Sequence, residues 1–500
     1  MEMEAKNIRR GGVWEKIFHT PQKTYESAAY WLLAVMIWMP IIQSPTYLAY
    51  IFSGSLNVMY GFVTYAIGYS FYGMAVICIF YSLWRLISWG CSWRRGELRF
   101  PGVKAFVKRY FLGVSAFAFL ILALISTLLS NDVLTGIFGH HQRTDGFLTY
   151  TGFLAIVLTG SQVRDEKKRA SLLKNILIVM ALCSVLMYLQ LFDVKPFSEW
   201  FNMEGAAFFR NSNHFGYILA IATLIASGAM FAARQKKTRV LAGFALAFFI
   251  LALLYNDTLG AHVGVLCAFV LMGFLYKPAL GVNRALSFLP LLIYAALFAF
   301  SAIVPSGRFE CSFFRKNFSS TMKDLDFVFS HLRQKLGSGA IVSAAQAEAA
   351  LPAASTSTDL TQGAGRLVLW KFTLQLIAQK PLFGWGGDQT RWEFIRNGMS
   401  WAPSPHNEYL NLASFFGIPA ALCYYSGQIW LLVRRLRGAR TLRRTTLVAL
   451  GAAFAYAVSA FFGVSQLHAA SYFYLVLGLV AADDRPDEAL TPPETPQPRD

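Results

Sequence analysis

Charged residues are scarce in this chain. Asp, Glu, Lys and Arg make up 14% of its 500 residues, whereas 55% are hydrophobic. A soluble globular protein carries about 25% charged residues. A chain so poor in charge cannot hide its apolar surface in one soluble core, so the composition predicts an integral membrane protein.

Cysteine and metal-ligand patterns are also sparse. Of the six cysteines, only Cys311 falls in the long polar segment between two blocks of apolar runs, where a lone thiol has no second thiol to pair with. No Cys and His spacing fits a zinc site, and Asp193, Glu199 and Glu204 are scattered along one loop. The sequence therefore predicts neither disulfides nor a bound metal, and it implies no cofactor.

The start of this sequence is not expected to be a cleavable signal peptide. The first apolar run, from Ala28, follows more than twenty polar and basic residues, and no small-residue cleavage site comes after a short core. The run is therefore expected to be a retained membrane span.

What the chain does contain is apolar runs. A helix that crosses a bilayer needs about 20 mostly apolar residues. Twelve candidate spans centre on residues 28–44, 61–83, 110–130, 146–163, 171–192, 213–233, 240–255, 261–276, 286–304, 407–433, 446–462 and 467–482.

The net charge of +18 has its own pattern, because the basic residues gather in every second connection between spans. This alternation sets membrane orientation and argues against nucleic acid as a partner. It puts both termini in the cytoplasm and the long connection outside, since long loops cross regardless of charge. The basic segments are Lys6–Lys23, Arg85–Arg109, Arg164–Arg169, Arg234–Arg239, Lys277–Arg284 and Arg434–Arg444.

The expected fold is thus all-α: a polytopic transmembrane helical bundle with about 12 spans and one large outer loop. Its predicted parts are a cytoplasmic segment 1–27, a membrane block 28–304, an extracytoplasmic loop 305–405, a second membrane block 406–482 and a disordered cytoplasmic tail 483–500.

The outer loop changes character along its length. Residues 337–361 are rich in Ala, Ser, Thr and Gly, which is typical of a flexible linker. From Gly365, apolar residues recur at helical spacing up to Pro381, which predicts an amphipathic helix on the bilayer surface or capping the bundle. Its predicted apolar stripe is Leu367, Trp370, Leu374 and Ile377, with Lys371, Gln375 and Gln379 opposite.

One polar cluster precedes the span at 213–233. Asn211 and Ser212 have the side chains of a helix N-cap, which satisfies free amides of the first turn. Arg210 offers a planar fork that suits phosphate oxygens, although contact with lipid headgroups would explain it equally well. Arg366 has the same two interpretations at the start of the loop helix.

A second cluster, His406-Asn407-Glu408, stands between the outer loop and the span at 407–433. A lone interfacial His is usually only a surface residue or a helix anchor. Polar groups that continue into a span are costly, however, and tend to be functional. His is also the side chain most easily tuned to accept a proton near neutral pH. The turn Gly384-Trp385-Gly386-Gly387 does not join a strand to a helix, so turn formation explains its glycines.

Three of these stretches resemble the O-antigen ligase and O-antigen polymerase family of membrane glycosyltransferases. They are Gly365-Arg366-Leu367 with Trp370, Pro381, Gly384 and Gly386; Pro405-His406-Asn407-Glu408-Tyr409-Leu410 with Gly417; and Arg210 with Asn213. Arg143 with Asp145 and Gly146 adds weaker support. The resemblance covers roughly residues 130–425, and its family-like core spans 205–425.

Two positions depart from the family pattern. Ala420 stands where the family often has Gly. Asn256-Asp257-Thr258 stands where the family often has Ser-Arg, so one expected phosphate-binding arginine is missing. Arg143 or Arg366 would then have to replace it.

The resemblance implies a GT-C-type fold and a glycan donor on undecaprenyl diphosphate. The glycan would pass with inversion, and without a metal, to the hydroxyl of a saccharide or lipid-saccharide acceptor at the outer face of the plasma membrane. It also implies the site residues, with His406 as the catalytic group. The implied substrate-binding residues are Arg210, Arg366, Arg143, Asn407, Glu408 and Asn213.

Two questions stay open at this stage. Ligase and polymerase share these motifs and differ in acceptor, so the sequence does not separate them. A transporter or flippase for lipid-linked glycans would also fit about twelve spans. A transporter, however, places polar groups near the middle of the membrane, whereas here most gather at one face.

Overall fold

The computed structural model describes residues 21–43, 58–94, 102–140, 143–192, 194, 206–209, 211–303, 364–399 and 402–482. Within these ranges every regular element is a helix and no strand occurs, so the all-α prediction is confirmed for the described chain. The predicted linker at 337–361 and the tail at 483–500 lie outside the described residues, as does Arg210.

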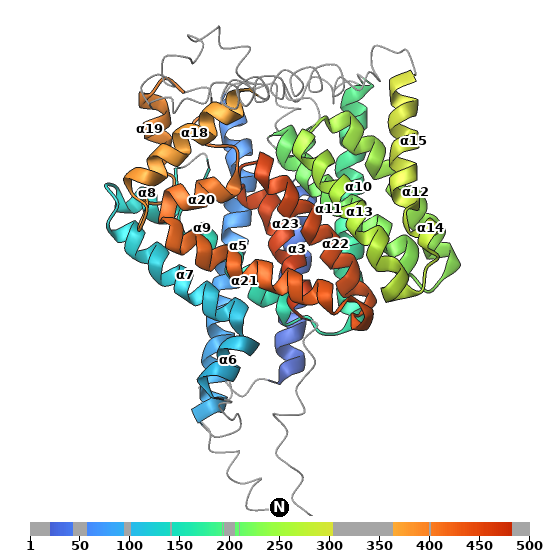
Figure 1. The fold of residues 1–500 in the computed structure, drawn as a ribbon, viewed down its shortest axis with the longest axis horizontal. Helices are drawn as coiled ribbons and strands as arrows, with labels where there is room; N and C mark the ends of the chain where they lie inside the picture. The colour runs from blue at the N-terminus through green and yellow to red at the C-terminus, as the bar shows by residue number, and fades with distance from the viewer. Residues whose placement is uncertain are drawn as a thin grey trace, which may run out of the picture.

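A helix stands at each of the twelve predicted spans (Figure 1). Eleven are α3 (Gln22–Ile42), α5 (Val58–Arg94), α7 (Phe111–Leu128), α9 (Phe147–Ser161), α10 (Glu166–Leu191), α11 (Ser212–Ala232), α12 (Lys236–Asn256), α13 (Leu259–Leu280), α15 (Leu289–Ile303), α22 (Arg444–Ser459) and α23 (Leu467–Ala481). The span at 407–433 is formed by two helices, α20 (Glu408–Phe416) and α21 (Ile418–Arg437).

The count of twelve spans is not confirmed. Of the described helices, eight are long and apolar enough to cross a membrane, and three further apolar helices are shorter, at 147–161, 289–301 and 467–481. α21 carries several arginines in its last turn, which lowers its hydropathy. The chain is therefore a multi-helix membrane protein.

The single helix expected at 407–433 breaks at Gly417, whose φ is +86°. A Cβ at this position would lie 2.2 Å from the carbonyl oxygen of Leu382. The turn after Pro381 packs here backbone to backbone, and the amide of Ile418 donates to the Pro381 carbonyl at 2.8 Å. Hydropathy alone cannot reveal the break, because both sides of it are apolar.

The centre of the bundle is built from α11, α22 and α23, which lie between α9 on one side and α13 on the other (Figure 1). Small residues allow close approach there: a Cβ on Gly160 in α9 would meet the Cα of Gly478 in α23 at 2.9 Å. Such small-residue contacts are how helices pack in a bilayer, where lipid competes for apolar surface. The outer helices α5, α7 and α12 instead expose large apolar side chains.

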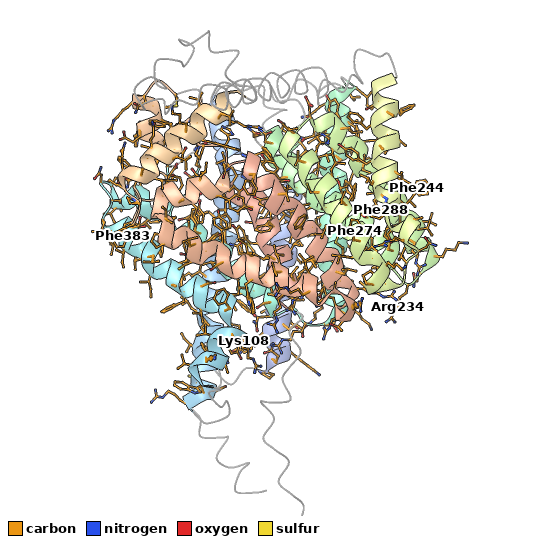
Figure 2. All side chains as sticks on the ribbon, viewed as in Figure 1. Lys108, Arg234, Phe244, Phe274, Phe288 and Phe383 are labelled. Atoms are coloured by element: carbon orange, nitrogen blue, oxygen red, sulfur yellow. The ribbon has the colours of Figure 1, made fainter. Side chains whose placement is uncertain are left out.

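The short helices separate to the two ends of the bundle (Figure 1). α6 (Val103–Arg109) lies at one end, and Lys108 and Arg234 both lie toward that end in Figure 2. α8 (Val133–Phe138), α18 (Ala364–Gln379) and α19 (Thr390–Arg396) lie at the other end. Connections predicted to be inner and outer thus fall at opposite ends of the molecule.

One basic residue predicted to lie in a connection is inside the bundle instead. Arg169 belongs to α10 and is fully buried. Its Nη2 donates to the Leu479 carbonyl at 2.9 Å and also to the Thr446 hydroxyl. Arg435 donates to the Val480 and Ala481 carbonyls at 3.1 and 3.2 Å. Two guanidinium groups therefore satisfy the last carbonyls of α23 and favour the negative end of its dipole.

The amphipathic helix forms as α18, but its predicted apolar stripe is wrong. The buried face carries Leu369, Thr373, Leu376 and Ile377, whereas Leu374 is 55% exposed. For most of the helix the buried residue directly precedes the predicted one, as Thr373 precedes Leu374. The sequence allows this error because leucines occur on more than one side of the helix. The buried face contacts Phe394 and Ala402, and α18 also contacts α20.

Candidate functional site

The site lies at the end of the bundle that carries α18 and α19, where the turn at 381–389 and the loop at 402–407 meet residues 139–140 and 143–146. Gly384 lies in the turn at 381–389 and has φ +66°. This turn packs so closely on α20 that a Cβ on Gly384 would meet the Phe415 carbonyl oxygen at 2.4 Å. The amides of Trp385 and Gly386 donate to the Ser414 and Phe415 carbonyls at 3.0 and 2.8 Å. The glycine-rich segment is thus a structural turn, as predicted.

His406 is held between two fixed neighbours. On one side, Trp370 of α18 donates from Nε1 to the Pro405 carbonyl at 2.9 Å. On the other, the Asn407 side chain accepts the Leu410 amide at 3.0 Å and caps α20. His406 itself has φ +48°, a left-handed conformation that is uncommon for a residue with a Cβ.

Left-handed backbone gathers at this place. Among the described residues, five other than glycine have positive φ, and Thr144, Asp388 and His406 all belong to the converging loops. Such conformations cost free energy and persist where the surrounding structure enforces them, which is frequent at functional sites. The backbone alone therefore marks this region as unusual.

Two arginines act on His406 electrostatically. Burial, together with the smaller effects of the charges of Arg143 and Arg366, lowers the pKa of His406 to about 4. Nη1 of Arg143 donates to the Pro403 carbonyl at 3.2 Å, which fixes it to the same loop. The structure thus brings together His406, Arg143 and Arg366, from positions far apart in sequence, around one imidazole that is neutral at pH 7.

Arg366 also reaches the central helices. Its Cζ lies 6.0 Å from the centre of the Phe462 ring in η5 (Ala460–Phe462). The Tyr217 hydroxyl of α11 donates to the Phe462 carbonyl at 2.9 Å. The loop helix and the start of α11, which carries Asn213, therefore meet at η5.

Glu408 follows the cap and is buried. Its Oε1 accepts the Tyr456 hydroxyl at 2.9 Å, and its carbonyl accepts the Tyr425 hydroxyl at 3.1 Å. These bonds join α20 to α22 and α21. Whether Glu408 and Asn407 also contact substrate, as the sequence predicts, stays a prediction.

The N-cap predicted ahead of α11 is confirmed. The Asn211 side chain accepts the Asn213 amide at 2.7 Å. In the region where the family often has Ser-Arg, Asn256 donates from Nδ2 to the Ser212 carbonyl at 2.9 Å. Asn256 thus holds the start of α11 in place. Asn213 is partly exposed beside it, and its predicted contact with substrate stays a prediction.

Sequence reasoning missed Asp388. This carboxylate is buried and accepts the His140 amide at 3.0 Å, which ties the two turns together. Asp145 is buried nearby and accepts Nδ2 of Asn411 at 3.0 Å. Burial raises the pKa of Asp388, and burial together with the charge of Asp388 raises that of Asp145 to about 7. The position of Asp388 directly after the Gly-Gly pair was the only available signal.

Arg143 lies among these acids. Its charge lowers the pKa of both Asp388 and Asp145, against the larger effect of burial. Arg143 therefore interacts electrostatically with both carboxyl groups as well as with His406. In the described part of the chain, no three His, Cys, Asp or Glu side chains group as metal ligands.

Comparison with known proteins adds one match. The O-antigen ligase family matches residues 244–425, a segment that contains Arg366, the turn at 381–387, His406 and Glu408. The predicted resemblance is thereby confirmed for this segment, while Arg143 and Arg210 precede it. No match was found among curated proteins.

Proposed function

We propose, on the premise that residues 244–425 form an O-antigen ligase domain, that the chain transfers a glycan from undecaprenyl diphosphate to an acceptor hydroxyl. The reaction takes place at the outer face of the plasma membrane, inverts the anomeric carbon and needs no metal. The observation that supports the proposal is that Arg143 and Trp370 of α18 both donate hydrogen bonds to the loop that carries His406, at the carbonyls of Pro403 and Pro405. Arg143 and Arg366 can bind an anion, and the neutral imidazole can accept the proton of a hydroxyl group.

His406 is assigned as the general base. The acceptor oxygen attacks the anomeric carbon while its proton passes to the imidazole. The bond from that carbon to the diphosphate oxygen breaks, and the diphosphate leaves with the electron pair. The imidazolium then returns its proton to solvent. A positioned acid–base group contributes about 10²–10⁴ to such a rate.

Arg143, Arg210 and Arg366 are assigned to the diphosphate. Guanidinium groups form paired, charge-assisted hydrogen bonds with phosphate oxygens and offset the charge that grows on the leaving group. They would do what a divalent cation does in other transferases. Two observations support this role for Arg366: its charge lowers the pKa of His406, and its guanidinium lies near the Phe462 ring of η5.

A reciprocal effect follows from this arrangement. The two arginine charges that depress the basicity of His406 are the charges that a bound diphosphate would compensate. Donor binding is therefore expected to raise the pKa of His406 and make it a stronger base only when the substrate is present. Asn213, Asn407 and Glu408 are assigned to holding donor and acceptor on either side of the imidazole.

The orientation belongs to the same proposal. Both termini are assigned to the cytoplasm, and the end carrying α18, α19 and His406 to the outside, where undecaprenyl-linked glycans and their acceptors would meet. The separation of α6 from α18 to opposite ends supports this assignment (Figure 1), as does the alternation of basic connections.

Purified protein in proteoliposomes tests the function against a transporter. With an undecaprenyl-diphosphate glycan and a saccharide acceptor supplied together, the proposal expects glycosylated acceptor and free undecaprenyl diphosphate, in the presence of EDTA. Movement of intact donor across the bilayer without new product would instead indicate a transporter. Activity lost in EDTA and restored by Mg²⁺ would refute metal independence.

A further inference from the structure

A second feature lies away from His406, toward the end of the bundle that carries α6. A groove of ≈ 2110 Å³ runs over α9 between α5 and α7 and continues beside α21. Its walls are mostly aliphatic and aromatic. Phe117 on α7 is 66% exposed and Leu83 on α5 is 49% exposed, and both line it. Apolar side chains exposed in this way on a membrane protein face hydrocarbon.

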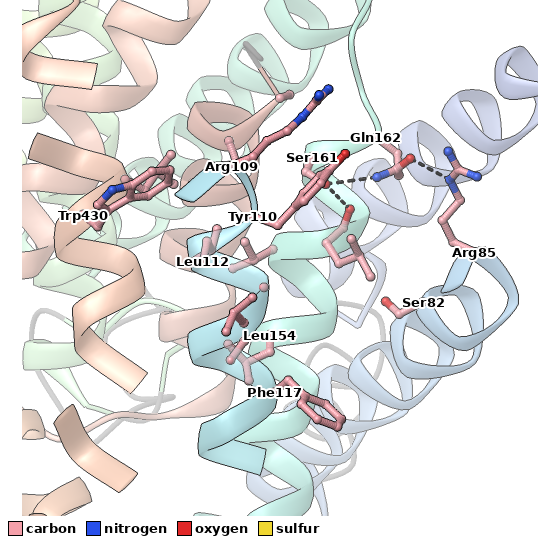
Figure 3. A pocket seen from close by; sticks show the side chains of 18 of the residues that line it. Ser82, Arg85, Arg109, Tyr110, Leu112, Phe117, Leu154, Ser161, Gln162 and Trp430 are labelled. Carbon is pink, nitrogen blue, oxygen red and sulfur yellow. Dashed lines mark hydrogen bonds between the residues drawn. The ribbon is translucent and has the colours of Figure 1, made fainter. Parts of the chain in front are cut away.

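One end of the groove is strongly basic. Arg85, Arg109, Arg164, Arg434 and Arg437 all line it, and none of the described residues that line it is acidic. Figure 3 shows Arg109 and Arg85 at one end of the site and Leu154 and Phe117 farther along α9 and α7. The groove therefore joins a cationic end to a long apolar body.

The basic end is structurally organised. Nε of Arg85 donates to Oε1 of Gln162 at 2.9 Å, and this bond holds the guanidinium at the C-terminal end of α9 (Figure 3). The guanidinium of Arg109 stands 5.3 Å from the Tyr110 ring centre, and that of Arg434 stands 5.1 Å from Trp430. Aromatic faces attract cations at such distances. These three side chains are thus oriented by neighbours rather than only by solvent.

We propose that this groove binds an acidic phospholipid of the membrane, with its phosphodiester at Arg85, Arg109 and Arg434 and its acyl chains along α7 and α9. The charge pattern favours a lipid over a free anion, because most of the surface is apolar. Basic pockets between membrane helices on the cytoplasmic side are where anionic headgroups bind. The site is separate from His406, so lipid binding does not depend on the proposed transferase activity, and only its cytoplasmic placement rests on the orientation proposed above.

Gly113 offers a way to test the apolar part. It lines the groove, and a Cβ added there would meet no atom within 4 Å. A large side chain at this position should therefore fill the groove without disturbing the packing of α7. Gly73 on α5 has the same open surroundings and does not line the groove, which makes it a matched control.

Arg284 supplies the control for the basic part. Its guanidinium stands 5.8 Å from the Phe274 ring centre, so it resembles Arg109 and Arg434 in its aromatic contact but does not line the groove. The matched set is then Arg109→Gln with Arg434→Gln, compared with Arg284→Gln, and Gly113→Trp, compared with Gly73→Trp.

The experiment titrates detergent-purified protein with phosphatidylglycerol and phosphatidylcholine of identical acyl chains and counts bound lipid by native mass spectrometry. The wild type should bind phosphatidylglycerol saturably and more tightly than phosphatidylcholine. The double arginine variant should lose about 25-fold in phosphatidylglycerol affinity, since each of the two basic residues near a headgroup contributes about a factor of five. Gly113→Trp should weaken binding as well, and both controls should match the wild type.

Three results would overturn the proposal. Equal affinity for the two lipids would remove the role of the arginines, and unchanged binding in Gly113→Trp would place the acyl chains elsewhere. An undecaprenyl phosphate that displaces phosphatidylglycerol at equimolar concentration would show that the groove takes a polyprenyl chain, not a phospholipid.

Discussion

At the scale of single residues, the central feature is the way charge surrounds His406. Arg143 and Arg366 come from segments more than two hundred residues apart, yet both charges lower the pKa of the same imidazole. The backbone at His406 is left-handed, with φ +48°. In the proposed function, the charges of these two arginines would be compensated by the diphosphate of the donor.

The arginine assignment predicts a specific loss. Arg366→Lys and Arg143→Lys keep the charge but lose the planar fork, so each should slow glycan transfer by about 10-fold to 100-fold, equivalent to one charge-assisted hydrogen bond. Arg396→Lys is the control, because its side chain is 71% exposed and pairs only with Glu393 at 2.6 Å. Initial rates with purified proteins are the measurement. Wild-type rates in both site variants would remove the diphosphate role.

The pH dependence should show the effect of the donor charge. In the free enzyme the pKa of His406 is lowered, so the neutral base persists below the ordinary pH range of His, and kcat/KM should not fall between pH 7.5 and 6. With donor bound, the arginine charges are compensated, and the acid limb of kcat should lie at higher pH than that of kcat/KM. The reverse order, or an acid limb near 6.5 in kcat/KM, would contradict the account.

How much of the site the sequence predicted can be judged from individual residues. His406, Arg366 and Arg143 were predicted from short polar motifs beside apolar runs and from the family resemblance, and their roles stay predictions. Asp388 was missed because it follows two glycines that a turn explains fully. Its importance depends on a tertiary contact with the His140 amide, which leaves no trace in local sequence.

At the scale of elements, backbone proximity rather than hydropathy decides the geometry. The break between α20 and α21 orients α20, whose first residues carry the site, and it depends on the contact of Gly417 with Leu382. The buried face of α18 likewise could not be deduced from its own sequence. The existence of this helix followed from apolar spacing and Pro381, but its buried face depended on Phe394 and Ala402, which the pattern could not include.

Gly417→Ala should therefore destabilise the protein. A left-handed residue with a Cβ costs about 1–2 kcal/mol, and here the Cβ would also overlap the Leu382 carbonyl. Gly398→Ala is the control: its φ is +77°, but nothing lies within 4 Å of a Cβ there. Thermal unfolding in detergent should show a clearly larger decrease for Gly417→Ala. Equal decreases would mean that the close contact contributes nothing.

At the scale of the whole molecule, composition predicted the class of protein and the positions of its helices. It did not yield a confirmed number of spans, because α9 and α23 are shorter than a bilayer requires and α21 ends in arginines. Burial also cannot be deduced from hydropathy. In the 18-residue apolar stretch of α11, 83% of the residues are buried, compared with 28% in α7, although α7 has the higher hydropathy. Position in the bundle, and not apolar character, separates them.

Orientation gives the prediction at this scale. A cysteine introduced at position 355, in a Cys311→Ala background, should react with an impermeant thiol reagent in intact cells or spheroplasts. A cysteine at position 237, near the start of α12, should react only after the membrane is permeabilised, because the basic connections are assigned to the cytoplasm. The opposite labelling pattern would invert the topology and place His406 inside.

The most direct test of the account is the His406→Ala protein, purified and assayed for glycan transfer from an undecaprenyl-diphosphate donor. The account predicts normal yield in the membrane, retained donor binding through the arginines, and a transfer rate lower by about 10²–10⁴. Normal yield with near-normal transfer would contradict it and would direct attention to Glu408 as the base. Reduced yield with the remaining protein fully active would show that His406 only anchors α20.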